Sequence, residues 1–241
     1  MPWHSRERQI EAGIDAGLVV DGCAELTRDM RVTKFEHATL VLREAGKTLV
    51  IDPGSFTSPL DDLGDLVGVV ITHEHADHWS AEHVTRLRDR YPDVPVYGPP
   101  GVVAAAAGFD VVPVHPDDRL DLAPFDLRFF GGRHAVIHSS IPVVDNVGVL
   151  VNDRFYYPGD SYAVPHGVTV ELLAAPVGAP WLKIGDAIDF VLEVAPRRAF
   201  ATHDMTLSAA GLEMGRARLR WAVEQDGGSF VALEPGDATD L

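Results

Sequence analysis

The densest chemistry in this sequence lies in one short loop. Residues 72–78 read Thr-His-Glu-His-Ala-Asp-His, which places three imidazoles and one useful carboxylate within seven positions. Imidazole nitrogens and carboxylate oxygens are common ligands of divalent metal ions. We expect His73 and His75 to bind one metal, and Asp77 and His78, beyond the turn, to bind a second. A solvated polar loop is the weaker interpretation, because the whole chain has only 11 histidines in 241 residues.

Two elements of regular structure must hold this loop in place. The apolar run 66–71 predicts a buried strand, and residues 80–90 predict a helix with Ser80 as its N-terminal cap. A loop between a strand end and a helix can hold ligands rigidly while it directs successive side chains to different points.

A two-metal site needs more ligands than one loop supplies, and other strand ends offer candidates. His134 follows a predicted strand through a glycine turn, and we prefer it to His138, four residues later, which stays open as the alternative. Asp160 ends a predicted hairpin strand, where its carboxylate could lie between two cations. His203 follows another predicted strand, although taken alone it reads more readily as a structural histidine.

The remaining pattern predicts an α/β fold. We expect strands near 30–35, 39–43, 48–52, 67–71, 94–97, 111–114, 126–130, 147–151, 154–157, 169–174, 198–201 and 229–233, and helices near 80–90, 102–107, 186–194 and 208–225. Hairpins mixed with βα units indicate two mixed sheets between helices, an αββα sandwich. Residues 1–29 differ in pattern, so we expect an N-terminal extension there and a single domain over 30–241.

Composition limits the partners and the location. A formal charge of −16 disfavours nucleic acid, although a small anionic substrate at a dication remains open. Cys23 is the only cysteine, so no intrachain disulfide and no thiolate metal site can form, and a reducing compartment is favoured. Without a membrane-span pattern or a signal-peptide pattern, we expect a cytoplasmic protein that acts on a small molecule. The oligomeric state is left open.

Taken together, these residues resemble the signature of the metallo-β-lactamase fold. The motif of residues 72–78 is joined, in the order of that family, by Asp52 in Ile-Asp-Pro-Gly, His134, Gly159-Asp160 and His203. The resemblance covers residues 30–241. It implies that one metal is held by His73, His75 and His134, that the other is held by Asp77, His78 and His203, that Asp160 bridges them, and that buried Asp52 supports the loop.

Within the superfamily, the chain is similar to compact hydrolases of the ascorbate-phosphate lactonase kind. Residues 35–39, Phe-Glu-His-Ala-Thr, match their early histidine-containing turn, and Asp160-Ser161 match another of their elements. His37 could therefore bind substrate or support a metal ligand, or it could be an ordinary strand-edge histidine. Lys183 could pair with a phosphate or carboxylate of the substrate, or be an ordinary exposed lysine.

The resulting hypothesis is a metal-dependent hydrolase with two divalent ions, Zn²⁺ first, with Mn²⁺ and Fe²⁺ chemically acceptable. A metal-bound water acidified toward a pKa of about 7 would supply hydroxide. Asp77 could orient that hydroxide and shuttle its proton. We expect a small ester, lactone or phosphoester as substrate. The alternative is a non-enzymatic metal-binding or sensing protein on the same fold.

Overall fold

The computed structural model describes residues 29–241. The expected extension 1–29 lies almost entirely outside the described residues, so the domain boundary at Met30 stays a prediction. Met30 itself is fully buried, and the first strand begins at the next residue.

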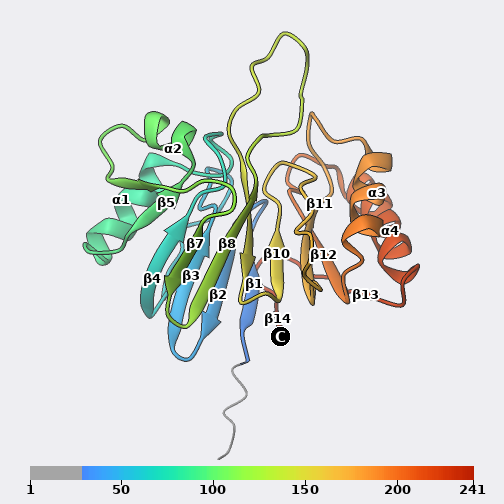
Figure 1. Ribbon diagram of the computed structural model, residues 1–241, viewed down its shortest axis with the longest axis horizontal. Helices are drawn as coiled ribbons and strands as arrows, with labels where there is room; N and C mark the ends of the chain where they lie inside the picture. The colour runs from blue at the N-terminus through green and yellow to red at the C-terminus, as the bar shows by residue number, and fades with distance from the viewer. Residues whose placement is uncertain (1–28) are drawn as a thin grey trace, which may run out of the picture.

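Two seven-stranded sheets form the centre of the described chain (Figure 1). In spatial order, the first contains β14 (Ala238–Asp240), β1 (Arg31–Lys34), β2 (Leu40–Glu44), β3 (Lys47–Ile51), β4 (Asp65–Val70), β5 (Val96–Gly98) and β6 (Val111–Pro113). The second contains β13 (Ser229–Phe230), β12 (Arg198–Thr202), β11 (Leu172–Pro176), β10 (Phe155–Tyr157), β9 (Val147–Val151), β8 (Phe125–Gly131) and β7 (Arg119–Leu122). Each sheet is antiparallel in one half, from β14 to β3 or from β7 to β10, and parallel in the other.

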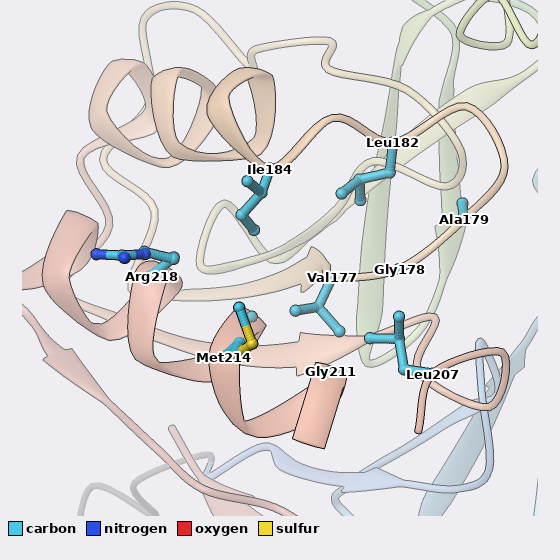
Figure 2. Close-up of a pocket in the computed structure, with 10 residues that line it drawn as sticks. Val177, Gly178, Ala179, Leu182, Ile184, Leu207, Gly211, Met214 and Arg218 are labelled. Carbon is cyan, nitrogen blue, oxygen red and sulfur yellow. The ribbon is translucent and has the colours of Figure 1, made fainter. Parts of the chain in front are cut away.

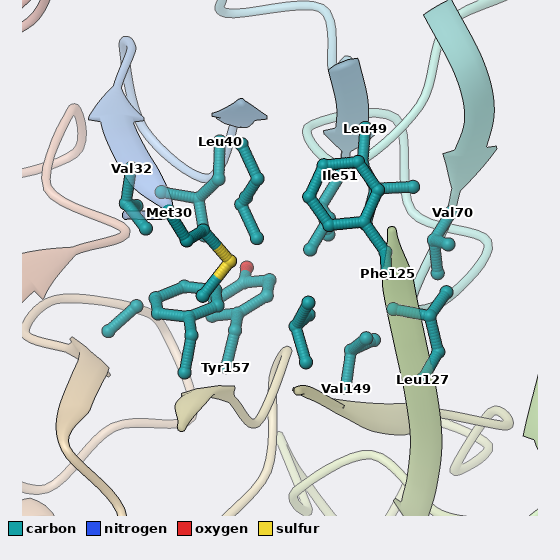
Figure 3. Close-up of a cluster of buried hydrophobic side chains, with 14 of the residues drawn as sticks. Met30, Val32, Leu40, Leu49, Ile51, Val70, Phe125, Leu127, Val149 and Tyr157 are labelled. Atoms are coloured by element: carbon teal, nitrogen blue, oxygen red, sulfur yellow. The ribbon is translucent and has the colours of Figure 1, made fainter. Parts of the chain in front are cut away.

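Four helices cover the outer faces of these sheets (Figure 1). They are α1 (Ala81–Arg90), α2 (Pro100–Ala105), α3 (Ile184–Val194) and α4 (Ala209–Glu224). One buried cluster joins α1 and α2 to the first sheet, and another joins α3 and α4 to the second. A third, which includes Ile51, Phe125 and Tyr157, fills the space between the sheets (Figure 3). The predicted αββα sandwich of two mixed sheets is confirmed.

Local sequence explains several element boundaries. The turn between β2 and β3 has φ of 49° at Ala45 and 78° at Gly46, as a tight hairpin with two left-handed residues requires. The side chain of Ser80 accepts a hydrogen bond from the backbone of His83, so the predicted cap of α1 is confirmed. No helix between residues 29 and 241 combines the length and apolar character that crossing a membrane requires.

Two edge strands escaped the sequence pattern. No strand was expected at 119–122, yet β7 pairs there with β8, and its Leu120 and Leu122 pack against the core between the sheets. The short polar strand β14 pairs with β1 and carries no apolar pattern. The expected strand 229–233 ends at Phe230 in β13, and β11 begins at Leu172, three residues later than expected.

Candidate metal centre

The candidate ligands come from the segments that follow strands of both sheets. The loop 72–78 follows β4, and Asp160 and His203 follow β10 and β12. His134 lies just beyond β8, in the long connection to β9 that projects from the body of the molecule (Figure 1). Of these four strands, β4 belongs to the first sheet and β8, β10 and β12 belong to the second, so the site forms only when the two sheets pack together.

The structure gathers these side chains into two groups of potential ligands. One group is His73, His75, His134 and Asp160, and the other is His37, Asp77, His78 and His203, with ligand atoms within 4.8 Å of one another in each group. All seven ligands suggested by the sequence are therefore brought together. The addition is His37, which we had placed among the substrate contacts.

Asp160 lies between the two groups. Its carboxylate oxygens are 3.1 Å from Nε2 of His78, 3.1 Å from Nε2 of His203, 3.3 Å from Nε2 of His134 and 3.9 Å from Nε2 of His73. Its side chain is only 3% exposed, so these contacts are shielded from water. A single carboxylate in contact with both groups is the arrangement that a bridging ligand requires.

Three of the histidines use Nδ1 to donate a hydrogen bond to an oxygen acceptor. The pairs are His78 with Oδ2 of Asp52 at 2.6 Å, His134 with the carbonyl of Ala135 at 2.5 Å, and His203 with the carbonyl of Gly178 at 2.5 Å. A carbonyl or carboxylate oxygen fixes the proton on Nδ1, so in the neutral imidazole Nε2 keeps its lone pair. All three Nε2 atoms point to Asp160.

The same atoms lack hydrogen-bond partners within the described residues. Nε2 of His78, His134 and His203, and Oδ1 of Asp160, are buried polar atoms without an aligned partner. Leaving a buried polar atom unpaired costs about 1–3 kcal/mol, so four together in a native site call for a ligand. Nitrogen and oxygen donors without sulfur suit Zn²⁺, Mn²⁺ or Fe²⁺. The residues therefore fit divalent cations.

Among the protein groups alone, the histidines and carboxylates perturb one another strongly. Burial opposes charge on Asp160, but the neighbouring His78 and His203 outweigh it and hold the pKa of this carboxyl well below its usual range. Burial likewise lowers the pKa of His78 and His203, but Asp160 outweighs it, raising the pKa of His78 well above normal and that of His203 to about 9. Metal binding must therefore displace protons.

Asp77 is the most accessible carboxylate of the site. Its side chain is 25% exposed, whereas that of Asp160 is 3% exposed. Burial would raise its pKa, but the neighbouring imidazoles of His203 and His37 outweigh burial and hold the pKa of this carboxyl well below its usual range, so the group stays ionised. An ionised carboxylate at the open side of a metal site can hold and pass a proton.

Asp52 supports the metal loop from beneath. It is fully buried, and its carboxylate accepts hydrogen bonds from the backbone and the hydroxyl of Thr72, each at 2.7 Å, besides the one from His78. Its backbone adopts a left-handed φ of 51°, an uncommon conformation for a residue with a side chain. These contacts agree with the supporting position that the resemblance implied.

Neither His37 nor Lys183, the two expected substrate contacts, lies in the wall of an exposed pocket. His37 is fully buried, and its Nε2 lies 3.1 Å from Oδ2 of Asp77. Burial lowers the pKa of His37 despite that contact, so its imidazole is neutral. The ammonium of Lys183 is exposed and pairs at 3.1 Å with Asp186 of the helix that it precedes. Neither observation places these residues in contact with a substrate.

Between the two candidate histidines of the β8–β9 connection, the structure brings His134 into the site. His138 is exposed, its Nδ1 contacts the hydroxyl of Ser140 at 2.7 Å, and it belongs to neither group of ligands.

Two further residues hold Asp160 that the sequence patterns did not single out for this purpose. Trp181 donates from Nε1 to Oδ2 of Asp160 at 2.7 Å. Oδ1 of fully buried Asn146 accepts from the backbone N–H of Asp160 at 2.9 Å. Neither residue stands in a sequence motif that indicates such a contact.

An apolar groove lies next to the site, between the start of α3 and α4 (Figure 2). Its volume is about 370 Å³, and Val177, Leu182, Leu207 and Met214 are among its lining residues. Gly178 also lines it, through the same loop whose carbonyl accepts from His203. No candidate metal ligand lines the groove, so it neighbours the chemical centre and is not part of it.

Two mixed sheets between helices, with histidines and aspartates beyond the strand ends, define an αββα protein with a candidate metal centre. The family described as Beta-lactamase superfamily domain matches residues 31–203, and the chain belongs to that superfamily.

Several known proteins are similar over most of their length. Protein Rv0786c of Mycobacterium tuberculosis is 40% identical over 195 residues, which cover 78% of this chain and 91% of that protein. A UPF0173 protein, PF0020 of Pyrococcus furiosus, is 26% identical over 82% of this chain and 96% of its own, so the expected likeness to compact members is confirmed. Igni18, a metallo hydrolase from Ignicoccus hospitalis, shares the fold, with a TM-score of 0.69 at 16% identity over 88% of this chain and 98% of that one.

Proposed function

We propose that the protein is a metal-dependent hydrolase that acts on a small ester, lactone or phosphoester at a two-metal centre, with Zn²⁺ as the expected ion. The observation that carries this proposal is the pair of ligand groups joined by Asp160, with three buried Nε2 atoms directed at that carboxylate. The similarity to Igni18, described as a metallo hydrolase, supports it at the level of the fold.

The chain's own residues divide the chemistry between binding and proton transfer. When bound, divalent cations lower the pKa of a coordinated water and polarise a carbonyl or phosphoryl oxygen. His73, His75 and His134 would hold one ion, His78, His203 and Asp77 the other, and Asp160 would contact both. Asp77, ionised and partly exposed, orients the attacking water and accepts its proton.

The groove beside the centre bears on the choice of substrate. Its walls are mostly aliphatic and suit an apolar portion of a substrate, while Arg218, which also lines it, suits an anionic group. Among lactones, esters and phosphoesters, we therefore favour substrates that carry a short hydrocarbon portion. We propose that this activity is lactonase-like and that the protein acts in the cytoplasm.

Elemental analysis combined with a hydrolase panel tests the proposal. We expect the purified full chain to bind two divalent ions and to hydrolyse lactones or esters, and to lose activity with a chelator. Holo protein with two ions that turns over nothing in a broad panel would instead favour the non-enzymatic alternative.

A matched pair of alanine variants tests the ligand assignment. His134→Ala should lower metal content by about one equivalent, because its buried Nε2 lies 3.3 Å from Asp160. His138→Ala should leave metal content unchanged, since that exposed ring hydrogen-bonds to the neighbouring Ser140 and belongs to neither group of ligands in the described part of the chain. The opposite pattern would overturn the assignment.

A further inference from the structure

His37 is held from two sides by the segment that follows β12. The residue lies in the turn between β1 and β2 with a left-handed φ of 59°. Its carbonyl accepts a hydrogen bond from the backbone N–H of His203 at 2.8 Å, and its Nδ1 accepts one from the backbone N–H of Met205 at 3.2 Å. The ring is fully buried, with its centroid 3.9 Å from that of His203 and 4.9 Å from that of Phe56.

The contact with Met205 decides which ring nitrogen carries the proton. A backbone N–H can only donate, so Nδ1 of His37 must present a lone pair. In that tautomer Nε2 bears the hydrogen, and this atom faces Oδ2 of Asp77 at 3.1 Å. A protonated nitrogen has no lone pair with which to bind a metal.

His37 therefore carries its ring proton on the opposite nitrogen from the other histidines of its group. In His78 and His203 an oxygen acceptor lies at Nδ1, which leaves Nε2 free to act as a ligand. In His37 a donor lies at Nδ1, which makes Nε2 a donor. The ring sits at ligand distance from its neighbours, yet its proton points into the site.

We propose that His37 is not a metal ligand but a neutral hydrogen-bond donor that positions the carboxylate of Asp77. This inference rests on the proposed two-metal centre. Asp77 is the most exposed carboxylate of the site, so it depends on fixed partners to keep one orientation. The N–H of His37 that donates to Asp77 belongs to a ring held by the backbone of the segment that follows β12. Because His37 is fully buried, it cannot contact substrate.

Two substitutions test the roles of the two ring nitrogens of His37 separately. Asparagine tolerates the left-handed backbone, and its amide oxygen can accept from Met205, but it is too short to reach Asp77. Glutamine is long enough to place an amide donor near Asp77. His37→Asn should therefore remove the donor alone, and His37→Gln should restore it.

The test is titration of the full chain with Zn²⁺ against a competing chelator. We expect His37→Asn to bind as many ions as the unmodified chain at saturation, with the affinity for one ion lowered about 10-fold. His37→Gln should lie within about threefold of the unmodified chain. His203→Ala should bind one ion fewer, and His166→Asn, at an exposed histidine outside the site, should change nothing.

Three results would overturn the proposal. They are the loss of a whole metal equivalent in His37→Asn, an affinity of that variant within twofold of the unmodified chain, or a His37→Gln variant as weak as His37→Asn. Because this titration needs no turnover, it stays informative if no hydrolase substrate is found. Conversely, a failed hydrolase panel would leave the donor assignment untouched.

A nitrogen NMR measurement on the Zn²⁺-loaded, unmodified chain tests the tautomer even if a variant fails to fold. Long-range ¹H–¹⁵N spectra distinguish protonated from unprotonated ring nitrogens. We expect His37 to show an unprotonated Nδ1 and a protonated Nε2, unlike His203. A proton on Nδ1 of His37 would refute the proposal.

Discussion

Asp52→Asn is the sharpest perturbation of the metal loop that leaves every ligand in place. The substitution keeps the shape of the side chain but replaces one carboxylate oxygen by an NH₂ group. One amide oxygen can still accept from the backbone of Thr72, whereas the position facing Nδ1 of His78 can receive a donor. A donor there reverses the tautomer of His78, so that Nε2 carries the proton and cannot bind a metal.

The magnitude follows from the bond that is lost. The contact between Asp52 and Nδ1 of His78 is 2.6 Å long and fully buried, and a hydrogen bond to a charged group contributes about 1.5–3 kcal/mol. At 1.4 kcal/mol per tenfold change, this predicts a metal affinity lowered about 10- to 100-fold. The unfolding free energy without metal should also fall by about 1–3 kcal/mol, because Thr72 loses an acceptor for its hydroxyl.

The assay is Zn²⁺ titration with elemental analysis, followed by urea unfolding of the metal-stripped protein. Asp62→Asn is the matched control, because Asp62 has the same left-handed backbone, with φ of 53°, but lies exposed outside the site. We expect the control to change neither quantity. If Asp52→Asn bound both ions within threefold of the unmodified affinity, the argument that Asp52 fixes the His78 tautomer would fail.

Two other predictions concern stability and pH. Lys34→Met should lower the unfolding free energy by about 3–5 kcal/mol in urea titrations, because it leaves Asp204 buried without its partner at 2.9 Å, whereas Lys47→Met, at an exposed pair, should cost at most about 1 kcal/mol. Equal costs would contradict this. The pKa of His203 is raised to about 9, so protonation of this residue stabilises the folded, metal-stripped protein. This contribution is about 3 kcal/mol of unfolding free energy; it is fully present below pH 6.5 and is lost as the pH rises to 9. Zn²⁺ affinity should run the opposite way, rising at least tenfold per pH unit toward pH 9 because the pKa of His78 is also raised, and a flat profile would contradict displacement of these protons.

The sequence predicted those parts of the site that depend on local pattern. The loop 72–78 holds several ligands between one strand and one helix, so its spacing alone indicates metal binding. Asp160 and His203 each follow an apolar run that forms a buried strand, but that position alone favoured a structural role for His203, and only the family resemblance indicated it as a ligand. Strands β7 and β14 were not predicted. The polar strand β14 is stabilised by pairing with β1 at a sheet edge, and β7 alternates polar residues with Leu120 and Leu122 over only four positions, too few to stand out as a strand pattern.

The assignment of His37 could not come from spacing, because it depends on a proton. Met205, whose N–H fixes the tautomer, lies 168 residues away in the chain, and the acceptor that gives His203 the opposite tautomer is the carbonyl of Gly178, 25 residues away. Both partners are backbone groups, which every residue offers equally, so residue type carries no information about them. A histidine that binds a metal and one that donates to a metal ligand are therefore identical in sequence, and only the folded contacts at Nδ1 distinguish them.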